Sequence, residues 1–240
     1  MQWYTGPEGD QRIWYEQSDI EQVMSEQLRK AKQRLTLANP VPDLESFVEN
    51  YLGVDLDQYA TLDKDVLGLT EFNGSQSPRM QISVTLTEAA DAVPPSLGMR
   101  GRWRATIAHE AAHVVLHRYL FDPAMVPIRQ GDVRDPIEMA VQSGELKRMQ
   151  CLHRDIDVTR SVPTRVARDW REIQANRGMA ALLMPESIFM RVAAMNGAVK
   201  GNPVGGETDN GIKLIADVAT AFEVSKQAAS FRLRGFGLLA

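Results

Sequence analysis

Apolar and polar residues follow two different periods along the first half of the chain. Apolar residues three and four positions apart predict a helix over 19–35, which the sequence NPVP at 39–42 ends. A shorter helix is predicted over 44–52, with Asp43 as its N-cap and Gly53 just past its end.

The period then changes to two, which is typical of half-buried strands. Runs of this kind cover 53–62, 66–72 and 79–86, and the turn sequence NGS separates the last two. A loop rich in proline follows, and the next helix is predicted to begin near Arg102. These runs predict a small antiparallel or mixed sheet.

The second half of the chain is predicted to be helical. Apolar spacing indicates helices over 135–151, 164–184, 186–197, 212–222 and 225–235. Pro185 ends the second of these, and the glycine-rich segment 197–211 is a loop. We therefore expect an α+β protein that is mainly helical, with one small sheet and small C-terminal helices.

Composition and charge narrow the class of protein. The net charge of −4 provides no overall positive field for nucleic acid or membrane, so a DNA contact would need a local patch. Cys151 is the one cysteine, which excludes an internal disulfide and fits a reducing compartment. The start resembles no signal peptide and no apolar run reaches the length of a membrane span. We expect a cytoplasmic protein with no membrane partner.

Three of the four histidines lie in ATIAHEAAHVVLH at 105–117. His109 and His113 are one helical turn apart and can face the same point. Glu110 flanks that face, close enough to take a proton from a water held between the histidines. Neutral imidazoles bind Zn²⁺, and an open coordination position lets the ion acidify water. The string predicts a catalytic zinc site; an accidental match on a buried helix is the alternative.

His117 continues the same stripe, one turn further along. It lies eight residues from His109 (117 − 109 = 8), which is about 12 Å along a helix that rises about 1.5 Å per residue. Because Zn–N bonds are only about 2 Å long, the two histidines cannot bind the same ion. We expect His117 to be structural or to support a ligand by a hydrogen bond.

A catalytic zinc site usually has a third protein ligand on another rigid element. His153 is one candidate. Glu172 is a better one, because it lies on a strongly predicted helix, where small Ala175 lets that helix approach the histidines. Asn176, one turn further, could hydrogen-bond a zinc-binding histidine through its other nitrogen. The alternative is that Glu172 is a surface glutamate of an amphipathic helix.

Two motifs together resemble the ImmA/IrrE family of zinc metallopeptidases. RWRATIAHEAAHVVLH is similar to the family pattern AHExxHxxxH, and WREIQANRGMAALLMP is similar to ExxANxFAAxLLMP. Gly178 and Met179 stand where family members more often have Phe and Ala. The resemblance covers residues 43–185, and the motifs occur in the expected order.

The resemblance implies a role for each of four residues. His109, His113 and Glu172 would bind Zn²⁺, and Glu110 would be the catalytic base. In such folds the strand before the histidine helix usually forms the edge that binds substrate, which here would be 79–86.

The residue patterns, together with the resemblance, predict a division of the chain. We expect an N-terminal helical arm, a zincin-like metallopeptidase domain, an insertion or lid within that domain, and C-terminal helices of helix-turn-helix type. These parts correspond to residues 1–42, 43–196, 122–165 and 211–240, respectively.

Further residues are candidates for oxyanion stabilisation or regulation. His153 and Tyr119 could donate a hydrogen bond to an oxyanion, as could three arginines near the start of the histidine helix: Arg100, Arg102 and Arg104. We favour a solvated helix start for the arginines. Cys151 could occupy the open zinc position as a thiolate and inhibit the enzyme, although a half-buried residue of the insertion is the simpler interpretation.

The last two helices are typical of a helix-turn-helix, with Glu223 in place of the usual turn glycine. Residues 186–240 contain six Lys or Arg and five Asp or Glu, a net charge of +1. Because this charge is weak for DNA binding, we favour packing or partner docking over direct DNA binding.

The expected function is hydrolysis of a peptide bond in a protein substrate by a zinc-dependent endopeptidase. The resemblance implies that the substrate is a helix-turn-helix transcriptional repressor or an antitoxin, often in stress responses. The alternative is a non-proteolytic, zinc-containing regulator that binds protein or DNA. The presence of Glu110 favours the peptidase, because a binding scaffold has no need of the base.

Overall fold

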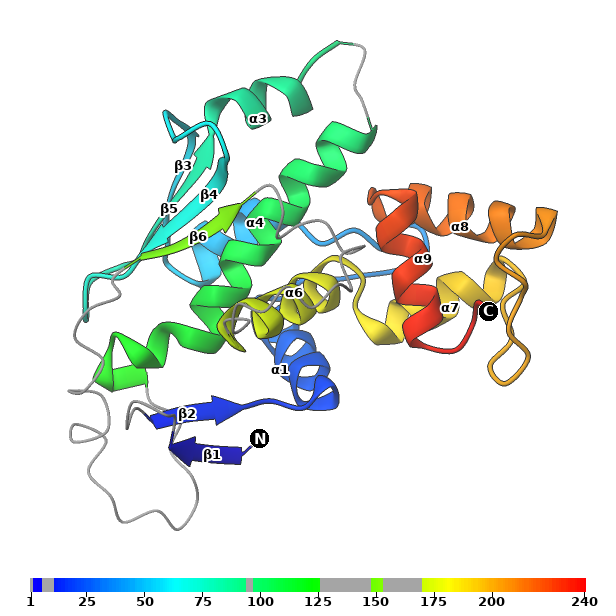
Figure 1. The fold of residues 1–240 in the computed structure, drawn as a ribbon, viewed down its shortest axis with the longest axis horizontal. Coiled ribbons are helices and arrows are strands. Elements are labelled where there is room, and N and C mark those ends of the chain that lie inside the picture. The colour runs from blue at the N-terminus through cyan, green and yellow to red at the C-terminus, as the bar shows by residue number, and fades with distance from the viewer. Residues whose placement is uncertain (1, 6–10, 94–96, 126–147, 153–169) are drawn as a thin grey trace.

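The computed structural model describes residues 2–5, 11–93, 97–125, 148–152 and 170–240 (Figure 1). Within these residues a four-stranded sheet, a two-stranded sheet and a set of helices form an α+β protein with helices at its C-terminal end, as predicted. In this part of the chain no single helix is both long and apolar enough to span a membrane; Trp170–Leu183 and Glu186–Met195 meet that test only together, as a pair bent by 55°.

The larger sheet has the strand order β3-β5-β4-β6. Its strands are β3 (Asp55–Ala60), β4 (Val66–Glu71), β5 (Arg79–Ser83) and β6 (Arg148–Leu152). β3 is parallel to β5, whereas β4 is antiparallel to both β5 and β6, so the sheet is mixed. The predicted NGS turn joins β4 to β5, and Gly74 within it has a left-handed φ of 62°.

Helices account for most of the remaining described residues. They are α1 (Gln17–Lys30), α2 (Leu44–Ser46), α3 (Val84–Ala90), α4 (Leu97–His117), α6 (Trp170–Leu183), α7 (Glu186–Met195), α8 (Asp209–Phe222) and α9 (Lys226–Gly235). The predicted cap of α2 is confirmed, because the Asp43 side chain accepts a hydrogen bond from the Ser46 amide at 3.0 Å. A π-helical turn over Phe47–Tyr51 extends α2, and Gly53 follows with a φ of 66°.

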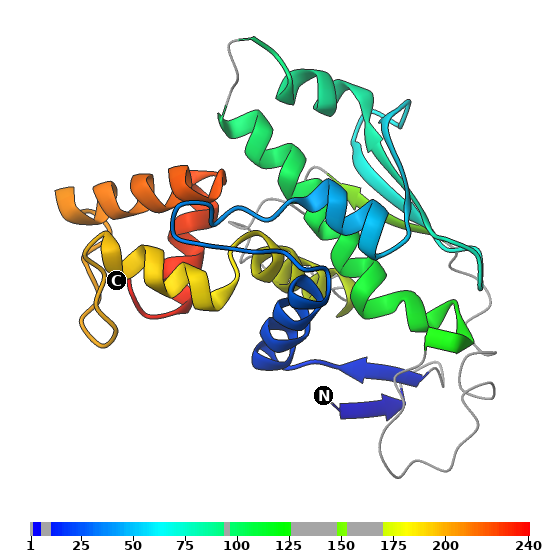
Figure 2. The same cartoon turned by 180° about the vertical axis from the view of Figure 1, so that it is seen from behind.

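The histidine helix α4 lies between the larger sheet and α6 (Figures 1 and 2). Its middle is fully buried at Ile107, Ala108, Ala111 and Ala112. A Cβ atom at Gly178 of α6 would lie 2.7 Å from the Cβ of Ala112, closer than real Cβ contacts. The glycine that departs from the family motif therefore lets α6 approach α4 without a clash.

The N-terminal residues form a hairpin that the sequence did not predict. β1 (Gln2–Thr5) pairs antiparallel with β2 (Gln11–Trp14), and α1 then packs against α6. Helix α1 ends at Lys30, earlier than the predicted end at residue 35, and Lys32 takes a left-handed φ of 58°. The apolar residues Ala31 and Leu35 continue the helical spacing past Lys30. They pack against the core, but they lie outside the helix.

The C-terminal helices α8 and α9 are joined by a short turn, as predicted. Glu223 takes a left-handed conformation there, with φ 52° and ψ 45°, where a helix-turn-helix usually has glycine. The Ser225 hydroxyl accepts a hydrogen bond from the Ala228 amide at 3.1 Å and caps α9. The turn lies against α4, since a Cβ atom at Gly101 would be 3.3 Å from the Ser225 nitrogen.

A buried ion pair fastens α9 to the rest of the protein. The guanidinium of Arg232 donates hydrogen bonds to the carboxylate of Glu21 on α1 and, at 2.7 Å, to the carbonyl of Met184. Arg232 is only 7% exposed and Glu21 only 9%. Removing one partner of such a pair leaves a buried charge uncompensated. Arg232 is therefore a packing residue and is not presented to a DNA phosphate.

The position of β5 contradicts the prediction about the substrate edge. β5 ends at Ser83, and Val84–Ala90 form α3 instead of continuing the strand. β5 also lies between β3 and β4, so its backbone is paired on both sides and cannot receive a peptide. Among the described strands, β3 and β6 form the edges. Alternation shows that a strand is half-buried but not which neighbours it pairs with.

β6 corrects part of the interpretation of the segment between the motifs. Residues 148–151 were predicted to end a helix, yet they belong to a strand whose backbone pairs with β4. This part of the predicted insertion over 122–165 is therefore part of the sheet. The rest of the predicted helix, and the parts of the predicted insertion or lid at 126–147 and 153–165, lie outside the described residues.

The sequence predicted that the arginines near the start of α4 are solvated, and for Arg104 this is wrong. Arg104 is 6% exposed and donates to the carbonyl of Pro42 at 3.1 Å. Arg100 forms an ion pair with Glu223 at 3.0 Å. The helix begins at Leu97, earlier than predicted, so Arg104 lies well inside it and its side chain is covered by the segment before α2.

Candidate metal centre

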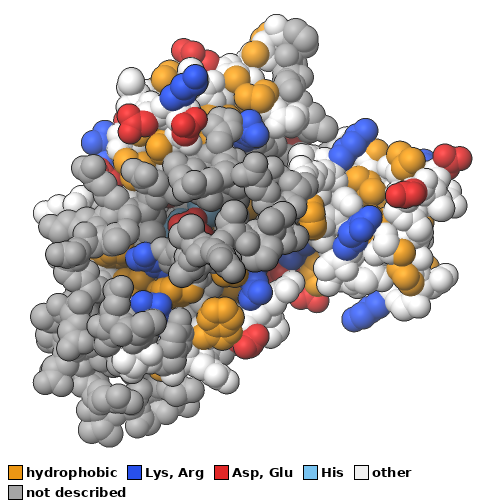
Figure 3. Space-filling view, in the orientation of Figure 1, with side chains coloured by type: hydrophobic (Ala, Val, Ile, Leu, Met, Phe, Trp, Pro, Cys, Tyr) orange, Lys and Arg blue, Asp and Glu red, His pale blue; other side chains and the backbone are white. Residues whose placement is uncertain are grey.

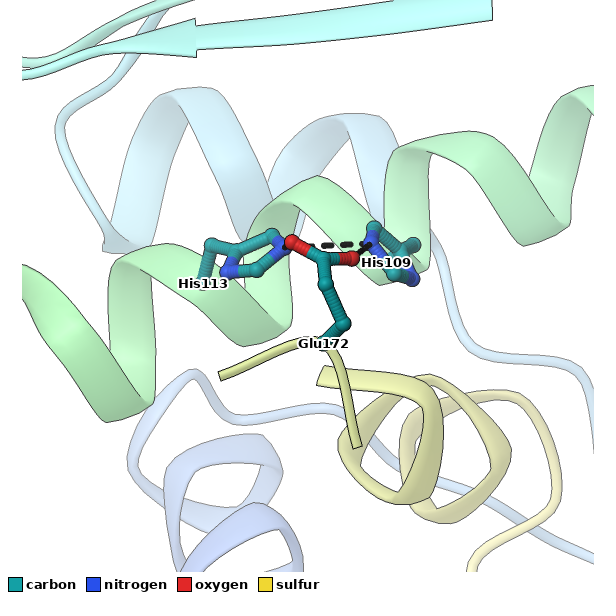
Figure 4. A group of neighbouring side chains, drawn as sticks. All are labelled: His109, His113 and Glu172. Atoms are coloured by element: carbon teal, nitrogen blue, oxygen red, sulfur yellow. Dashed lines mark hydrogen bonds and ion pairs between the residues drawn. The ribbon is translucent and has the colours of Figure 1, made fainter. Parts of the chain in front are cut away.

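Two histidines of α4 and one glutamate of α6 converge on a single point (Figure 4). The Nε2 atoms of His109 and His113 are 3.0 Å apart. The Glu172 carboxylate places one oxygen 3.2 Å from Nε2 of His109 and the other 3.3 Å from Nε2 of His113. The i, i+4 spacing aligns the two imidazoles, and the close packing of α6 on α4 brings the carboxylate to them. This group could hold a metal ion.

The centre is buried but reachable. Both histidine side chains are 0% exposed, whereas the side chain of Glu172 is 26% exposed. In the space-filling view, histidine and acidic side-chain atoms are visible at the bottom of a hollow (Figure 3). Of the three side chains, Glu172 is therefore the one that solvent contacts.

The charge state of Glu172 suits a metal ligand. Burial alone would raise its pKa, but hydrogen bonds and charge interactions with His109 and His113 outweigh burial and lower the pKa below the ordinary value. Glu172 is thus held as a carboxylate, and a cation would be the natural partner for this charge.

Glu110 faces the sheet from the same turn of α4. It is fully buried, and its Oε2 accepts a hydrogen bond from the hydroxyl of Thr70 on β4 at 2.5 Å. A Cβ atom at Gly68 would lie 2.7 Å from the Thr106 side chain and 3.2 Å from Oε1 of Glu110. Any larger residue at position 68 would clash with these side chains. Glycine therefore allows β4 to pack closely against Glu110.

A chain of hydrogen bonds leads from His113 to the N-terminal hairpin. Nδ1 of His113 lies 3.0 Å from Nδ1 of His117, and Nε2 of His117 lies 3.0 Å from Oε1 of Gln174. The amide nitrogen of Gln174 donates to the carbonyl of Ile13 at 3.0 Å. His117, Gln174 and the carbonyl of Ile13 thus form a relay behind the candidate ligand.

The relay determines which ring nitrogen of His113 carries the proton. The carbonyl of Ile13 can only accept, so Gln174 must present its NH₂ group there and its oxygen to His117. Burial lowers the pKa of His117 well below its usual value and keeps it neutral, so its Nε2–H donates to Gln174 and its Nδ1 accepts from His113. When a metal takes the place of the hydrogen bond between Nε2 and Glu172, His113 can therefore keep its proton on Nδ1 and leave the lone pair of Nε2 for the ion.

We expect Gln174→Leu to weaken metal binding about 10- to 100-fold, the usual effect of losing a hydrogen-bond partner behind a metal ligand. His117 would lose its acceptor, and the proton of His113 would no longer be confined to Nδ1. Metal affinity measured by competition with a chelator tests this. Tyr119→Phe is the matched control, because it removes a hydrogen bond to the same hairpin without touching the relay. Unchanged affinity in a folded Gln174→Leu protein would contradict the relay.

His117 lies 3.0 Å from His113, where a supporting residue would lie, whereas Asn176 is bonded elsewhere. The side chain of Asn176 donates to the carbonyl of Glu172 in its own helix at 2.9 Å rather than to a histidine ring. The residue that continues the hydrogen bonding is Gln174, on the adjacent face of α6. The sequence analysis missed Gln174. It could have been noticed as a polar residue at a position that the helical period assigns to the core.

Tyr119 lies at the hairpin and not among the three converging side chains. Its hydroxyl accepts a hydrogen bond from the Ile13 amide at 2.9 Å, and its ring packs edge-on against Trp3. Both backbone groups of Ile13 are therefore bound, one by Tyr119 and one by Gln174. The oxyanion role considered for Tyr119 stays a prediction, and the structure places its hydroxyl at the Ile13 amide.

The two remaining candidates are only partly placed by the structure. His153 lies outside the described residues. Cys151 lies in β6, where its backbone is paired with Gly68 of β4. Thr70 and Gly68 were also missed by the sequence analysis, because nothing in a strand pattern indicates which residue faces a buried carboxylate.

Comparisons with known proteins do not identify the chain. No known protein family matches it, and no curated protein does. The geometry of His109, His113 and Glu172 is therefore the direct support for a metal centre.

Proposed function

We propose that the protein is a zinc-dependent endopeptidase. The observation that carries this proposal is the convergence of His109, His113 and Glu172 from two helices, with Glu110 next to His109 on the histidine helix. Two histidines and a glutamate, with a position left open, form a ligand set typical of catalytic zinc in peptidases. Glu110 is a buried carboxylate that the three ligands do not need, which supports a role in the reaction.

The spacing of the donor atoms supports zinc as the ion. Donor atoms about 2.05 Å from a tetrahedral ion lie about 3.3 Å from one another. The two Nε2 atoms are 3.0 Å apart, and each lies 3.2 or 3.3 Å from a different oxygen of the Glu172 carboxylate, which is close to that value. The mixture of nitrogen and oxygen ligands also suits Zn²⁺ better than Mg²⁺ or Ca²⁺, which prefer oxygen.

The residues at and behind the metal centre have defined parts in the proposed reaction. Zn²⁺, when bound, supplies a Lewis acid that polarises the peptide carbonyl and lowers the pKa of water. Glu110 takes the proton from the attacking water and returns it to the amine of the leaving fragment. Thr70 orients the Glu110 carboxylate, and the relay through His117 and Gln174 orients His113.

The substrate class rests on the resemblance to the ImmA/IrrE family. We propose that a helix-turn-helix repressor or an antitoxin is cleaved in the cytoplasm, as part of transcription regulation in a stress response. The burial of Arg232 argues against direct DNA binding by α9, one of whose basic residues is thereby removed from the surface.

The test is whether the purified protein cleaves a helix-turn-helix repressor, and the first to be tried is any such repressor encoded beside its gene. We expect cleavage with bound zinc, loss of cleavage after treatment with 1,10-phenanthroline, and recovery when Zn²⁺ is added back. The chelator-treated protein without added metal is the control. If the repressor binds but stays intact under all three conditions, the protein acts as a zinc-containing regulator and the peptidase proposal is wrong.

A further inference from the structure

A pocket of about 570 Å³ lies between the N-terminal half of α4, the C-terminal part of α6, and α9. Its volume is in the range of ligand-binding pockets. Figures 1 and 2 both show α9 beside this part of α4 and α6. We call it the α9 pocket.

The α9 pocket continues the faces of the two helices that carry the candidate ligands. On α4, Ala105 lies one turn before His109, and Gly101 lies one turn before Ala105. On α6, Asn176 lies one turn after Glu172, and Ala180 one turn after Asn176. Because all four of these residues line the pocket, it begins about one helical turn, or about 5.4 Å along each axis, from the metal centre.

The lining of the α9 pocket is mostly apolar. Side chains of α4, α6 and α9 form its walls, among them Met99, Met179, Leu183, Ala228 and Phe231. Phe231 is 37% exposed, which is unusual for a large aromatic residue without an apolar partner over it. Such a surface suits a bulky apolar side chain.

The charges at the α9 pocket are predominantly positive. Arg102, Arg177 and Arg232 line it, with Glu21 as the acidic residue. Glu21 is engaged by Arg232, and no acidic residue in the described part of the chain pairs with Arg102 or Arg177. A ligand with a carboxylate near its apolar part would complement these two guanidinium groups.

We propose that the α9 pocket binds the substrate on one side of the scissile bond, with a bulky apolar side chain in the pocket and an acidic residue beside it. This inference rests on the proposed peptidase function, because it places the substrate by its distance from the metal centre. It assigns α9 a role as a wall of the substrate site. The C-terminal helices then select the peptide that is cleaved.

Peptide hydroxamates test the proposal without knowledge of the natural substrate. The probes carry either leucine or glycine next to the hydroxamate, in one series on its amino-terminal side and in another on its carboxy-terminal side. With zinc-loaded wild-type protein we expect the leucine probe of one series to bind at least about tenfold more tightly than its glycine counterpart, because burial of a leucine side chain supplies about that factor. Adding glutamate beyond leucine should tighten binding further, and Arg177→Ala should remove that gain.

Ala228→Trp fills the α9 pocket from α9, away from the metal ligands. We expect this variant to bind the glycine probe and zinc as the wild type does, but to lose the leucine preference. Ala194→Trp is the matched control, since Ala194 is exposed on α7 and does not line the pocket. Phe231→Ala is a second variant, expected to weaken the leucine preference by loss of contact area.

The outcomes separate the two proposals. If neither probe binds zinc-loaded wild-type protein, the metal centre accepts no substrate-like ligand, and the peptidase function fails together with this inference. If both probes bind equally, or if the leucine preference survives Ala228→Trp, the peptidase function stands and the α9 pocket is not a substrate site.

Discussion

Replacement of Glu110 by glutamine is expected to lower the rate of substrate cleavage by about 10²- to 10⁴-fold, the usual contribution of a general base. The glutamine side chain has nearly the same shape and can still accept the hydrogen bond that Thr70 donates to Glu110. It cannot take a proton from water. The fold and the three metal ligands are untouched, so metal content and thermal unfolding should match the wild type.

The measurement is the initial rate of repressor cleavage, with zinc content determined on the same preparation. Glu186→Gln is the matched control, because Glu186 is an exposed carboxylate at the start of α7 and far in sequence from the centre. Cleavage at the wild-type rate by Glu110→Gln would remove Glu110 from the reaction. Loss of zinc in that variant would instead show that Glu110 contributes to metal binding.

Replacement of Glu172 by alanine is expected to weaken zinc binding by about 10²- to 10³-fold, and cleavage should fall with it. Zinc sites with four ligands bind with about 10–16 kcal/mol, which corresponds to about 2.5–4 kcal/mol per ligand, and about 1.4 kcal/mol is a factor of ten. Glu172 is also the anionic member of the group, so its loss removes the attraction between its charge and the ion.

Zinc affinity by chelator competition measures this effect, and Glu207→Ala, an exposed carboxylate in the loop before α8, is the control. Glu110→Gln and Glu172→Ala are expected to differ in kind: the first keeps the metal and loses the reaction, whereas the second loses both. Full zinc occupancy and activity in Glu172→Ala would mean that another residue completes the centre.

Hydrophobic periodicity predicted helices and strands better than it predicted which segments of the chain they contact. The strands over 55–60 and 66–71 and the helices α6 to α9 were predicted from the sequence, because local periodicity and capping residues such as Asp43 and Ser225 act over a few positions. The pairing of β1 with β2 was missed. It is held in part through Ile13, whose partners Tyr119 and Gln174 lie more than 100 residues away.

The candidate site shows the same division. His109 and His113 could be paired from their spacing alone, since the helix brings residues four apart to one face. Glu172 required a second motif, and its distance from the histidines came only from the packing of α6 on α4 at Gly178 and Ala112. The sequence offered Asn176 as the supporting residue, but the structure uses Gln174, because helix rotation decides which face reaches His117.

The sequence by itself determined the α+β class, the i, i+4 histidine pair with its adjacent glutamate, and the two C-terminal helices. Each of these depends on residues within one or two turns of one another, where spacing and propensity decide the structure. Only the tertiary structure decided the strand order that places β5 inside the sheet, the relay from His113 to Ile13, and the pocket that α9 forms with α4 and α6. Those features depend on side-chain contacts between segments far apart in the chain, and a local pattern carries no information about such distances.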